Sequence, residues 1–423
     1  MAILKDLPPE LFHEIFAAMQ DDSERPLATL IACSVVSRLW RDIALPQLFS
    51  TFRTRRTESF TDVVRFLSTH AHIAACVKRL YLQRTGLVFP NPELKLHLKP
   101  EIDHHTVHAL LEHLPALHTL CFLGVKFVDA HVVPSGSQFA SSASPPVATT
   151  NTDALPDDLI RPHHLQWVTL QCCTVPRDPT PLFRILSLGD IGTFQVIHTE
   201  FPDEPLEPAA LHRTLRMRKL ELGLQSRWKL DRLLEAFQRR LEPGCVRELN
   251  VVCDNWTSIA SAGALLRDVG RNLTVLKLRL SHPGADAVND MKRWAALKLS
   301  SCTALETFHF LPSTFMMDGA GMSPGTAFTN IAGSLAPSVR TIVLGLDMFV
   351  DEARLKPAES LGLEKLDKAV MEGGQGRFPE LARVTLQFAS CKKDELEAWA
   401  TISRRAMPRL ERAGLLHVTC GDR

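Results

Sequence analysis

A short apolar pattern recurs along most of this chain, and it constrains the fold more than any other feature. Each copy has apolar residues at its first, fourth and sixth positions, as at Val77, Leu80 and Leu82. The other copies are Leu117, Leu120 and Phe122; Leu165, Val168 and Leu170; Met217, Leu220 and Leu222; Val246, Leu249 and Val251; Leu273, Leu276 and Leu278; Leu305, Phe308 and Phe310; Val339, Ile342 and Leu344; Leu381, Val384 and Leu386; a weaker copy at Ile191, Phe194 and Val196; and a degraded one at Leu410, Ala413 and Leu415. Alternate residues of a strand point to opposite faces, so the last two positions predict a strand that buries one face.

Helical patterns occupy several of the intervals between these strands. Candidate helices span 103–114, 229–241, 258–269, 286–299 and 394–406. A strand followed by a helix, repeated, predicts a parallel sheet with right-handed crossovers. One such unit cannot bury its own apolar face, so neighbouring units stack. We therefore predict an α/β fold in which residues 76–423 form an irregular solenoid similar to leucine-rich repeats, with a curved parallel sheet and outer helices. The alternative is an ordinary α/β domain whose strand patterns recur by coincidence.

Two stretches interrupt the repeat and are predicted to be loops, and a third is predicted to be a turn. Residues 134–158 are rich in Ser, Ala, Pro and Thr, which is typical of a flexible surface insertion. Residues 312–326 contain several glycines and two adjacent methionines that would suit a partner contact. Residues 372–377 predict a turn after a helix.

The first fifty residues carry more apolar side chains than three short helices can bury. Leu11, Ile15 and Met19 recur at four-residue spacing, with Phe12 and Phe16 beside them. A helical segment of this size leaves part of its apolar surface in water. Because contiguous exposed apolar surface usually marks a partner, the segment predicts a docking module. The alternative is that these helices only cap the core that follows.

The same stretch resembles a known family. Leu-Pro-Pro-Glu-Leu at 7–11, Ile-Phe at 15–16, Cys-Ser-Val-Val-Ser-Arg-Leu-Trp at 33–40 and Leu-Phe at 48–49 are together similar to the F-box, above all to F-box proteins of higher fungi. Two features depart from the family pattern: Met19 stands where Leu is usual, and the loop at 21–26 is longer than in many members. Neither departure removes an apolar anchor.

The resemblance implies a three-helix motif over residues 1–50 that binds the Skp adaptor of a cullin–RING ubiquitin ligase. Carried over by position, it places these residues at or near the adaptor interface: Leu7, Pro8, Leu11, Ile15, Phe16, Val35, Val36 and Trp40. Leucine-rich repeats often follow the motif in this family. Residues 51–75 would then be a helix that connects the two parts.

In such a solenoid the outward strand positions would contact a protein target. The candidates are Tyr81, Trp167, Gln171, Lys219, Glu221, Glu248, Asn250, Lys277, Arg279, His309 and Arg383. Tyr81 is the single tyrosine of the chain, and exposed Tyr, Trp and Arg often anchor interfaces. The alternative is that most of these positions are merely solvated.

Charge and composition exclude several classes of partner. Lys plus Arg number 48 and Asp plus Glu 47, so the formal net charge is +1. Nucleic acid and anionic membranes need a basic surplus, and we expect neither as a partner. An apolar run of about eighteen residues is missing, so we expect no membrane span. The ten cysteines contain no C-x-x-C pair, and the N-terminus lacks the pattern of a secretion signal, so we expect reduced thiols in a cytoplasmic or nuclear protein.

Catalytic motifs are missing from the chain as well. It contains no G-x-S-x-G, P-loop or H-E-x-x-H sequence. His104, His105 and His108 have helical spacing, but a solvated helix start explains them better than a metal site does. We expect no catalytic residue, metal or cofactor. The predicted function is a substrate receptor of a Skp–cullin–F-box ubiquitin ligase. The alternatives are an interaction scaffold without a role in ubiquitin transfer and, least favoured, an enzyme with a scattered site.

Overall fold

The computed structural model forms two compact units. It describes residues 14, 26–54, 59–83, 99–129, 163–202, 214–224, 230–280, 291–312, 324–346, 361–372, 378–389 and 393–421. Unit 1 comprises Met1–Val168 and Cys173–Asp190, and unit 2 comprises Thr169–Cys172 and Ile191–Arg423. The prediction for residues 134–158 lies outside the described residues.

Unit 1 combines a helix pair with parallel strands. Its elements are α2 (Pro26–Ser34), α3 (Arg38–Leu48), β1 (Thr51–Arg53), α4 (Phe60–Thr69), α5 (Ala71–Ala74), β2 (Arg79–Gln83), β3 (Glu101–Ile102), α6 (His104–His113), β4 (Thr119–Leu123), β5 (Lys126–Phe127), β6 (His163–Gln171) and α7 (Thr180–Leu186). Strands β1, β2, β4 and β6 are neighbours in that order, and β2 is parallel to both β1 and β4. The short strands β3 and β5 form a separate parallel pair.

The prediction of one connecting helix over residues 51–75 is wrong. Thr51, Phe52 and Arg53 form β1, and only then do α4 and α5 follow. Phe52 pairs with Leu80 of β2, so the parallel sheet begins before residue 76. The β-forming residues Thr51 and Phe52 gain ladder hydrogen bonds that an isolated linker helix could not offer.

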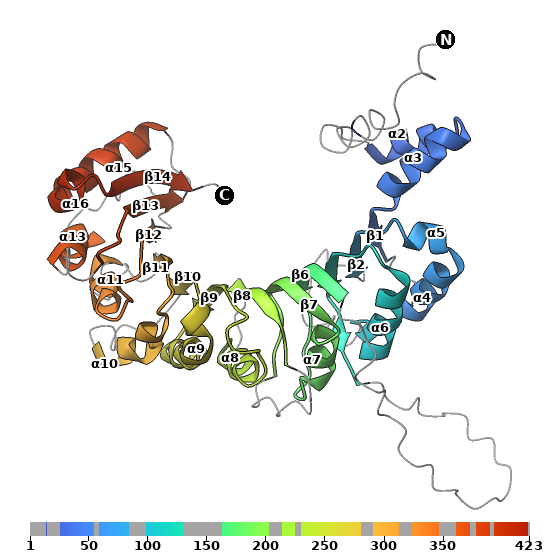
Figure 1. Ribbon diagram of the computed structural model, residues 1–423, viewed down its shortest axis with the longest axis horizontal. Coiled ribbons are helices and arrows are strands. Elements are labelled where there is room, and N and C mark those ends of the chain that lie inside the picture. The colour runs from blue at the N-terminus through green and yellow to red at the C-terminus, as the bar shows by residue number, and fades with distance from the viewer. Residues whose placement is uncertain are drawn as a thin grey trace, which may run out of the picture. The chain divides into compact units, whose positions relative to one another are not determined.

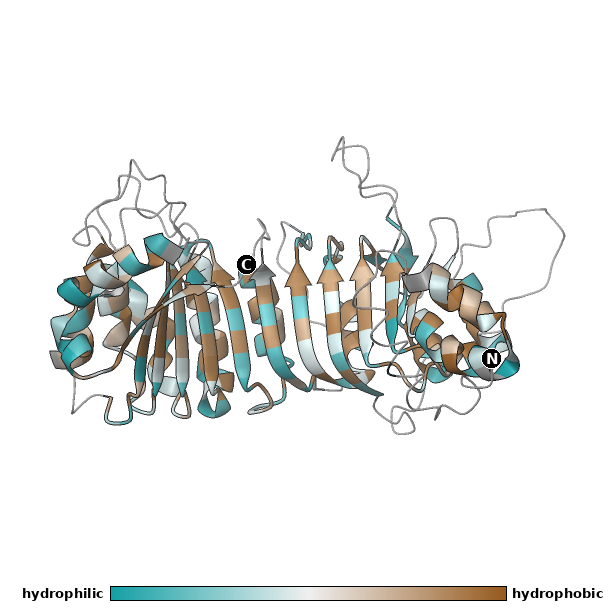
Figure 2. Ribbon diagram, turned by 90° about the horizontal axis from the view of Figure 1, so that it is seen from above, coloured by the Kyte–Doolittle hydropathy of each residue, from teal (hydrophilic) through white to brown (hydrophobic). Residues whose placement is uncertain are grey.

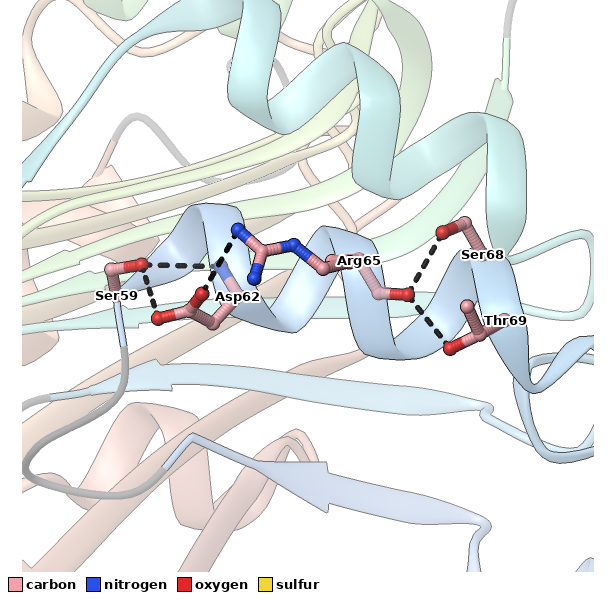
Figure 3. Close-up of polar contacts among 5 residues, drawn as sticks. All are labelled: Ser59, Asp62, Arg65, Ser68 and Thr69. Carbon is pink, nitrogen blue, oxygen red and sulfur yellow. Dashed lines mark hydrogen bonds and ion pairs between the residues drawn. The ribbon is translucent and has the colours of Figure 1, made fainter.

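Helix α4 begins at Phe60 because Ser59 caps its N-terminus (Figure 3). The Ser59 hydroxyl oxygen accepts from the Asp62 backbone N–H at 3.1 Å, and the same hydroxyl donates to the Asp62 carboxylate at 2.8 Å. Arg65 lies one turn on and approaches Asp62 at 3.3 Å. At the other end, the hydroxyls of Ser68 and Thr69 donate to the Arg65 carbonyl at 2.8 and 2.9 Å. The polar face of α4 is thus satisfied locally, and Phe60, Val63 and Leu67 are buried.

Unit 2 repeats a strand-and-helix unit. Its elements are β7 (Gly189–Ile197), β8 (Met217–Leu224), α8 (Leu230–Gln238), β9 (Glu248–Cys253), α9 (Trp256–Val269), η3 (Gly270–Asn272), β10 (Val275–Leu280), α10 (Met291–Trp294), η5 (Ala295–Leu297), η6 (Leu299–Ser301), β11 (Thr307–Pro312), α11 (Pro324–Ala332), β12 (Thr341–Leu346), α13 (Leu363–Glu372), β13 (Arg383–Ala389), α15 (Lys393–Ala406), α16 (Pro408–Arg412) and β14 (Leu416–Gly421). Strands β7 to β14 lie side by side in chain order, and each pairs in parallel with the next. Figure 1 shows α8, α9, α11 and α13 on one face of these strands.

The apolar pattern accounts for the core of unit 2. In β9, β10, β11 and β12 its last two residues are at most 1 % exposed, as for Leu276 and Leu278 of β10. The residues between them are half-buried in β9, β10 and β11, whereas Val343 of β12 is buried. Figure 2 shows the alternation of brown and paler or teal bands along the strands. The strand patterns therefore predict the buried face of the sheet correctly. The weaker copy at Ile191, Phe194 and Val196 is also confirmed, since all three residues are buried in β7.

Several predicted boundaries are wrong. The degraded copy is displaced: Leu416 and Val418, not Ala413 and Leu415, pair with the inward residues Val384 and Leu386. Gly414, with φ +68°, makes the turn that moves the strand start. Helix 286–299 is reduced, within its described part, to α10 and the 3₁₀ turns η5 and η6.

Other elements were not predicted at all. These are the helices α7, α11 and α16 and the short strands β3 and β5. Helix α11 starts within the loop expected over 312–326, at Pro324, where a proline costs no helical hydrogen bond. The turn predicted at 372–377 follows α13, and its residues from 373 on are outside the described ranges.

Candidate functional site

The exposed large apolar side chains of the described residues all lie in one short segment of unit 1. They are Ile31 at 51 % exposure, Val35 at 73 % and Val36 at 66 %. We call these three residues the apolar turn. Ile31 lies on α2, and the two valines form the connection to α3 (Figure 1). Keeping three such side chains exposed to water costs free energy that a partner would recover by covering them.

The helix pair buries a small core and leaves the apolar turn outside it. Leu30, Ile43 and Ala44 form this core, and Cys33, Trp40 and Leu48 pack against it partly buried. Leu30 and Ile31 are consecutive helical residues, so they point about 100° apart, and only one of them can face α3. Helices of nine and eleven residues offer too few inward positions for every apolar side chain that they carry.

Local hydrogen bonds hold the apolar turn in place. The backbone N–H of Val35 donates to Ala32 at 3.3 Å and that of Val36 to Cys33 at 3.1 Å. Ser37 then caps α3 by accepting from the Trp40 N–H at 3.2 Å. Because both backbones are fixed, the stiff valine side chains are presented to solvent without further ordering.

The predicted adaptor residues have different outcomes. Val35 and Val36 are exposed, and Trp40 is half-buried against the core of the helix pair. The remaining predictions, Leu7, Pro8, Leu11, Ile15 and Phe16, lie outside the described residues. Sequence reasoning missed Ile31 as a surface residue. Its position directly after Leu30, on a helix that packs one narrow face, was the available signal.

Comparison with known families gives one match. A family model described as F-box-like matches residues 4–55. This F-box-like domain includes α2, α3 and the whole apolar turn. No curated protein shows a significant match to the chain.

The open strand face of unit 2 carries most of the predicted target residues, and some of them bind one another. The Lys219 ammonium lies 2.8 Å from Glu221 and 3.7 Å from Glu248, and Gln195 donates to Glu221 at 2.9 Å. The hydrogen bond to Glu221 raises the pKa of Lys219 and outweighs the effect of its partial burial. Glu221 is itself only 8 % exposed. These side chains thus already bind one another, so fewer of their polar atoms are left to bind a partner.

The next strands hold a row of side chains that are not joined by such a network within the described part of the chain. Asn250, Lys277 and His309 lie in register on β9, β10 and β11, and all three are half-buried. Burial, and then the charge of Lys277, lowers the pKa of His309 to about 4, so its imidazole is neutral at pH 7. Arg279 is two residues on along β10, and Arg383 is exposed at the start of β13.

The unit 1 candidates are half-buried strand residues. The guanidinium of Arg53 lies 4.8 Å from the centre of the Tyr81 ring, so one face of that ring is already covered. Trp167 lies on β6 and is likewise half-buried. Gln171, at the end of the same strand and within unit 2, is half-buried too.

The described histidines of unit 1 do not gather into a group that could hold a metal ion. The rings of His104 and His105 are 3.9 Å apart, and burial, with the charges of His105 and Arg184, lowers the pKa of His104 to about 4. Among the described residues, no group of three or more His, Cys, Asp or Glu side chains could hold a metal ion. Nor is any helix in the described ranges long and apolar enough to cross a membrane.

Proposed function

We propose that this protein is a substrate-receptor subunit of a Skp–cullin–F-box ubiquitin ligase. The single observation that carries the proposal is the apolar turn, because the exposed large apolar side chains of the described residues gather inside the segment that matches the F-box-like model. F-box domains generally bind Skp-type adaptors. Ile31, Val35 and Val36 would supply apolar contact area, together with Leu7, Pro8, Leu11, Ile15, Phe16 and the half-buried Trp40.

The proposed mechanism is tethering. A receptor that binds the adaptor through one part and a target through another raises the effective concentration of target lysines near a charged conjugating enzyme. No catalytic residue is needed for this role. Unit 2 would capture the target as a leucine-rich-repeat-like domain. The support is its series of parallel strands with one buried face and a second face on which side chains such as Lys277 and His309 are half-buried.

Binding of a purified Skp-type adaptor tests the proposal. The double variant Val35→Asp with Val36→Asp should weaken adaptor binding by about a hundredfold, because each buried valine contributes about 1.5 kcal/mol and each tenfold change in affinity corresponds to about 1.4 kcal/mol. The measurement is a titration by calorimetry or surface plasmon resonance. Ile31→Asp alone should weaken binding about tenfold.

A matched control carries the same two charges elsewhere. Ala260 and Ala382 are exposed in unit 2, so Ala260→Asp with Ala382→Asp should leave the adaptor affinity unchanged. Circular dichroism spectra should be the same for all variants. Equal affinity of the valine variant and the wild-type chain would disprove the adaptor-binding role.

A reconstituted ubiquitination assay then distinguishes the substrate-receptor role from the interaction-scaffold role. A receptor should assemble with adaptor and cullin and support ubiquitin transfer to a captured protein. Adaptor binding without cullin assembly would favour the interaction scaffold instead.

A further inference from the structure

Six arginines gather where β8, β9 and β10 of unit 2 begin. They are Arg216, Arg218, Arg239, Arg240, Arg247 and Arg271. We call this set the basic edge. The strands are parallel, so their starts lie at one edge of the sheet, and the ends of the preceding helices meet the same edge. Arginines from three separate chain segments are therefore brought together.

Backbone hydrogen bonds hold the three segments against one another. The N–H of Leu215 donates to the Arg240 carbonyl at 2.8 Å, and the N–H of Arg247 donates to the Arg218 carbonyl at 2.8 Å. The third segment joins through Val275, whose N–H donates to the Arg247 carbonyl at 3.1 Å. The basic edge is thus part of the folded sheet and not a set of arginines on independent loops.

Further contacts fix the two later segments. The Arg247 guanidinium donates to the Asn272 carbonyl at 3.2 Å. The Asn272 amide in turn donates to the Gly244 carbonyl at 3.3 Å. Arg271, next to Asn272, is therefore held close to the segment that carries Arg247.

Negative charge at this edge is scarce and mostly engaged. Segments 214–218, 239–248 and 270–275 contain two acidic residues, Glu242 and Glu248. Asp268, at the end of α9, accepts from the Gln238 amide at 2.7 Å and lies 3.8 Å from Arg267. Glu306 precedes β11, and its N–H donates to the Thr274 carbonyl at 3.0 Å. Glu242 pairs with Arg216 at 2.8 Å, and Glu248 lies 3.7 Å from Lys219. The edge keeps a positive surplus in a chain whose formal net charge is only +1. Such a local surplus attracts a partner of opposite sign.

Four of the arginines are available to a partner. Arg218, Arg239, Arg247 and Arg271 are all exposed. Within the described ranges, none of these four takes part in an ion pair. Their guanidinium groups can each hold a carboxylate through two parallel hydrogen bonds.

The chemistry of the edge favours an acidic polypeptide over a nucleic acid. Single-stranded nucleic acids are held by basic grooves with aromatic side chains on which bases stack, and the three segments contain no Phe, Trp or Tyr. The starts of β8 and β10 are roughly 10 Å apart, which is about three residues of an extended chain. We propose that the basic edge binds an acidic segment of a partner protein, whose Asp and Glu carboxylates pair with Arg218, Arg239, Arg247 and Arg271.

The test is a titration of the full chain, without adaptor, by fluorescence anisotropy. The probe is a labelled ten-residue peptide of alternating Glu and Gly, with a Lys–Gly peptide of the same length and a single-stranded oligonucleotide as comparisons. The Glu–Gly peptide should bind most tightly, and its affinity should fall at least tenfold between 50 and 200 mM salt. The Lys–Gly peptide should not bind. Because no adaptor is present, this outcome is independent of the proposed ligase function.

Charge reversal localises the binding. Arg218→Glu with Arg247→Glu should weaken binding of the Glu–Gly peptide at least tenfold, and the milder pair Arg218→Gln with Arg247→Gln should weaken it in the same direction. The control Arg65→Glu with Arg405→Glu removes the same charge from exposed positions outside the edge and should change the affinity less than twofold. The inference is overturned if the Glu–Gly peptide does not bind at 50 mM salt or if the oligonucleotide binds more tightly than the peptide. It is also overturned if the control Arg65→Glu with Arg405→Glu weakens binding as much as Arg218→Glu with Arg247→Glu does.

Discussion

At the scale of single residues, one buried carboxylate shows how distant parts of unit 2 are joined. Asp367 on α13 is only 4 % exposed. Its two oxygens accept from the backbone N–H groups of Arg409 at 3.2 Å and Leu410 at 2.9 Å. These donors belong to the first turn of α16, so a side chain on another helix replaces the missing N-terminal cap. A helix of five residues depends strongly on such a contact.

Removing that cap should destabilise unit 2. Asp367→Ala leaves two buried N–H groups without acceptors, and we expect a loss of about 2 kcal/mol in the free energy of unfolding. Asp367→Asn keeps one acceptor oxygen and should lose less. Urea unfolding followed by circular dichroism measures both. Equal losses for the alanine and asparagine variants would show that the capping contact is not what stabilises α16.

At the scale of elements, the spacing of apolar residues along the chain predicts the strands better than the identity of those residues does. Alternation by two predicts every strand from β7 to β13, because the buried face of a parallel sheet covered by helices admits few polar residues. Helix boundaries are harder to predict. Asn255 caps α9 through the Ser258 N–H, and the Ser258 hydroxyl contacts the Asn255 backbone in return, so the helix starts two residues before the predicted 258.

Helix α9 packs closely against the 3₁₀ turn η5, and this contact predicts how a substitution at Gly263 will affect stability. A Cβ at Gly263 would collide with the carbonyl of Ala296, so Gly263→Ala should lower the free energy of unfolding by about 2 kcal/mol although alanine is the better helix former. The control is Ala260→Gly, at an exposed position of the same helix, which should cost about 1 kcal/mol through propensity alone. Thermal or urea unfolding gives both values. A stabilised Gly263→Ala chain would mean that the two elements are not in contact.

At the scale of the whole molecule, the helix pair and the strands have separate buried cores. The core of the helix pair consists of Leu30, Ile43 and Ala44 with their half-buried neighbours, all within residues 30–48. Unit 2 buries its own set of strand and helix residues. The proposed division between adaptor docking and target capture is consistent with two cores that do not share residues.

Truncation tests that division. A chain lacking residues 1–49 retains β1 and all later elements, so we expect it to unfold cooperatively within a few degrees of the full chain and to lose adaptor binding completely. Differential scanning calorimetry and an adaptor titration are the measurements. Affinity capture with both chains, followed by identification of the bound proteins, should return the same target but not the adaptor from the shortened one. Aggregation of the shortened chain would place the domain boundary elsewhere.

Sequence by itself determined the positions of strands β7 to β13 and the apolar excess of the N-terminal segment. Both are local properties: period two in apolar residues specifies a one-sided strand, and an excess of apolar residues in a short helical segment predicts exposure. Tertiary structure decided which side chains meet. Strand pairing places Leu416 beside Val384 and Lys219 beside Glu248, and the packing of α2 against α3 through Leu30 leaves Ile31 exposed to solvent. It also collects arginines from 216 to 271 at one edge, because parallel crossovers return the chain to the same end of the sheet before each strand.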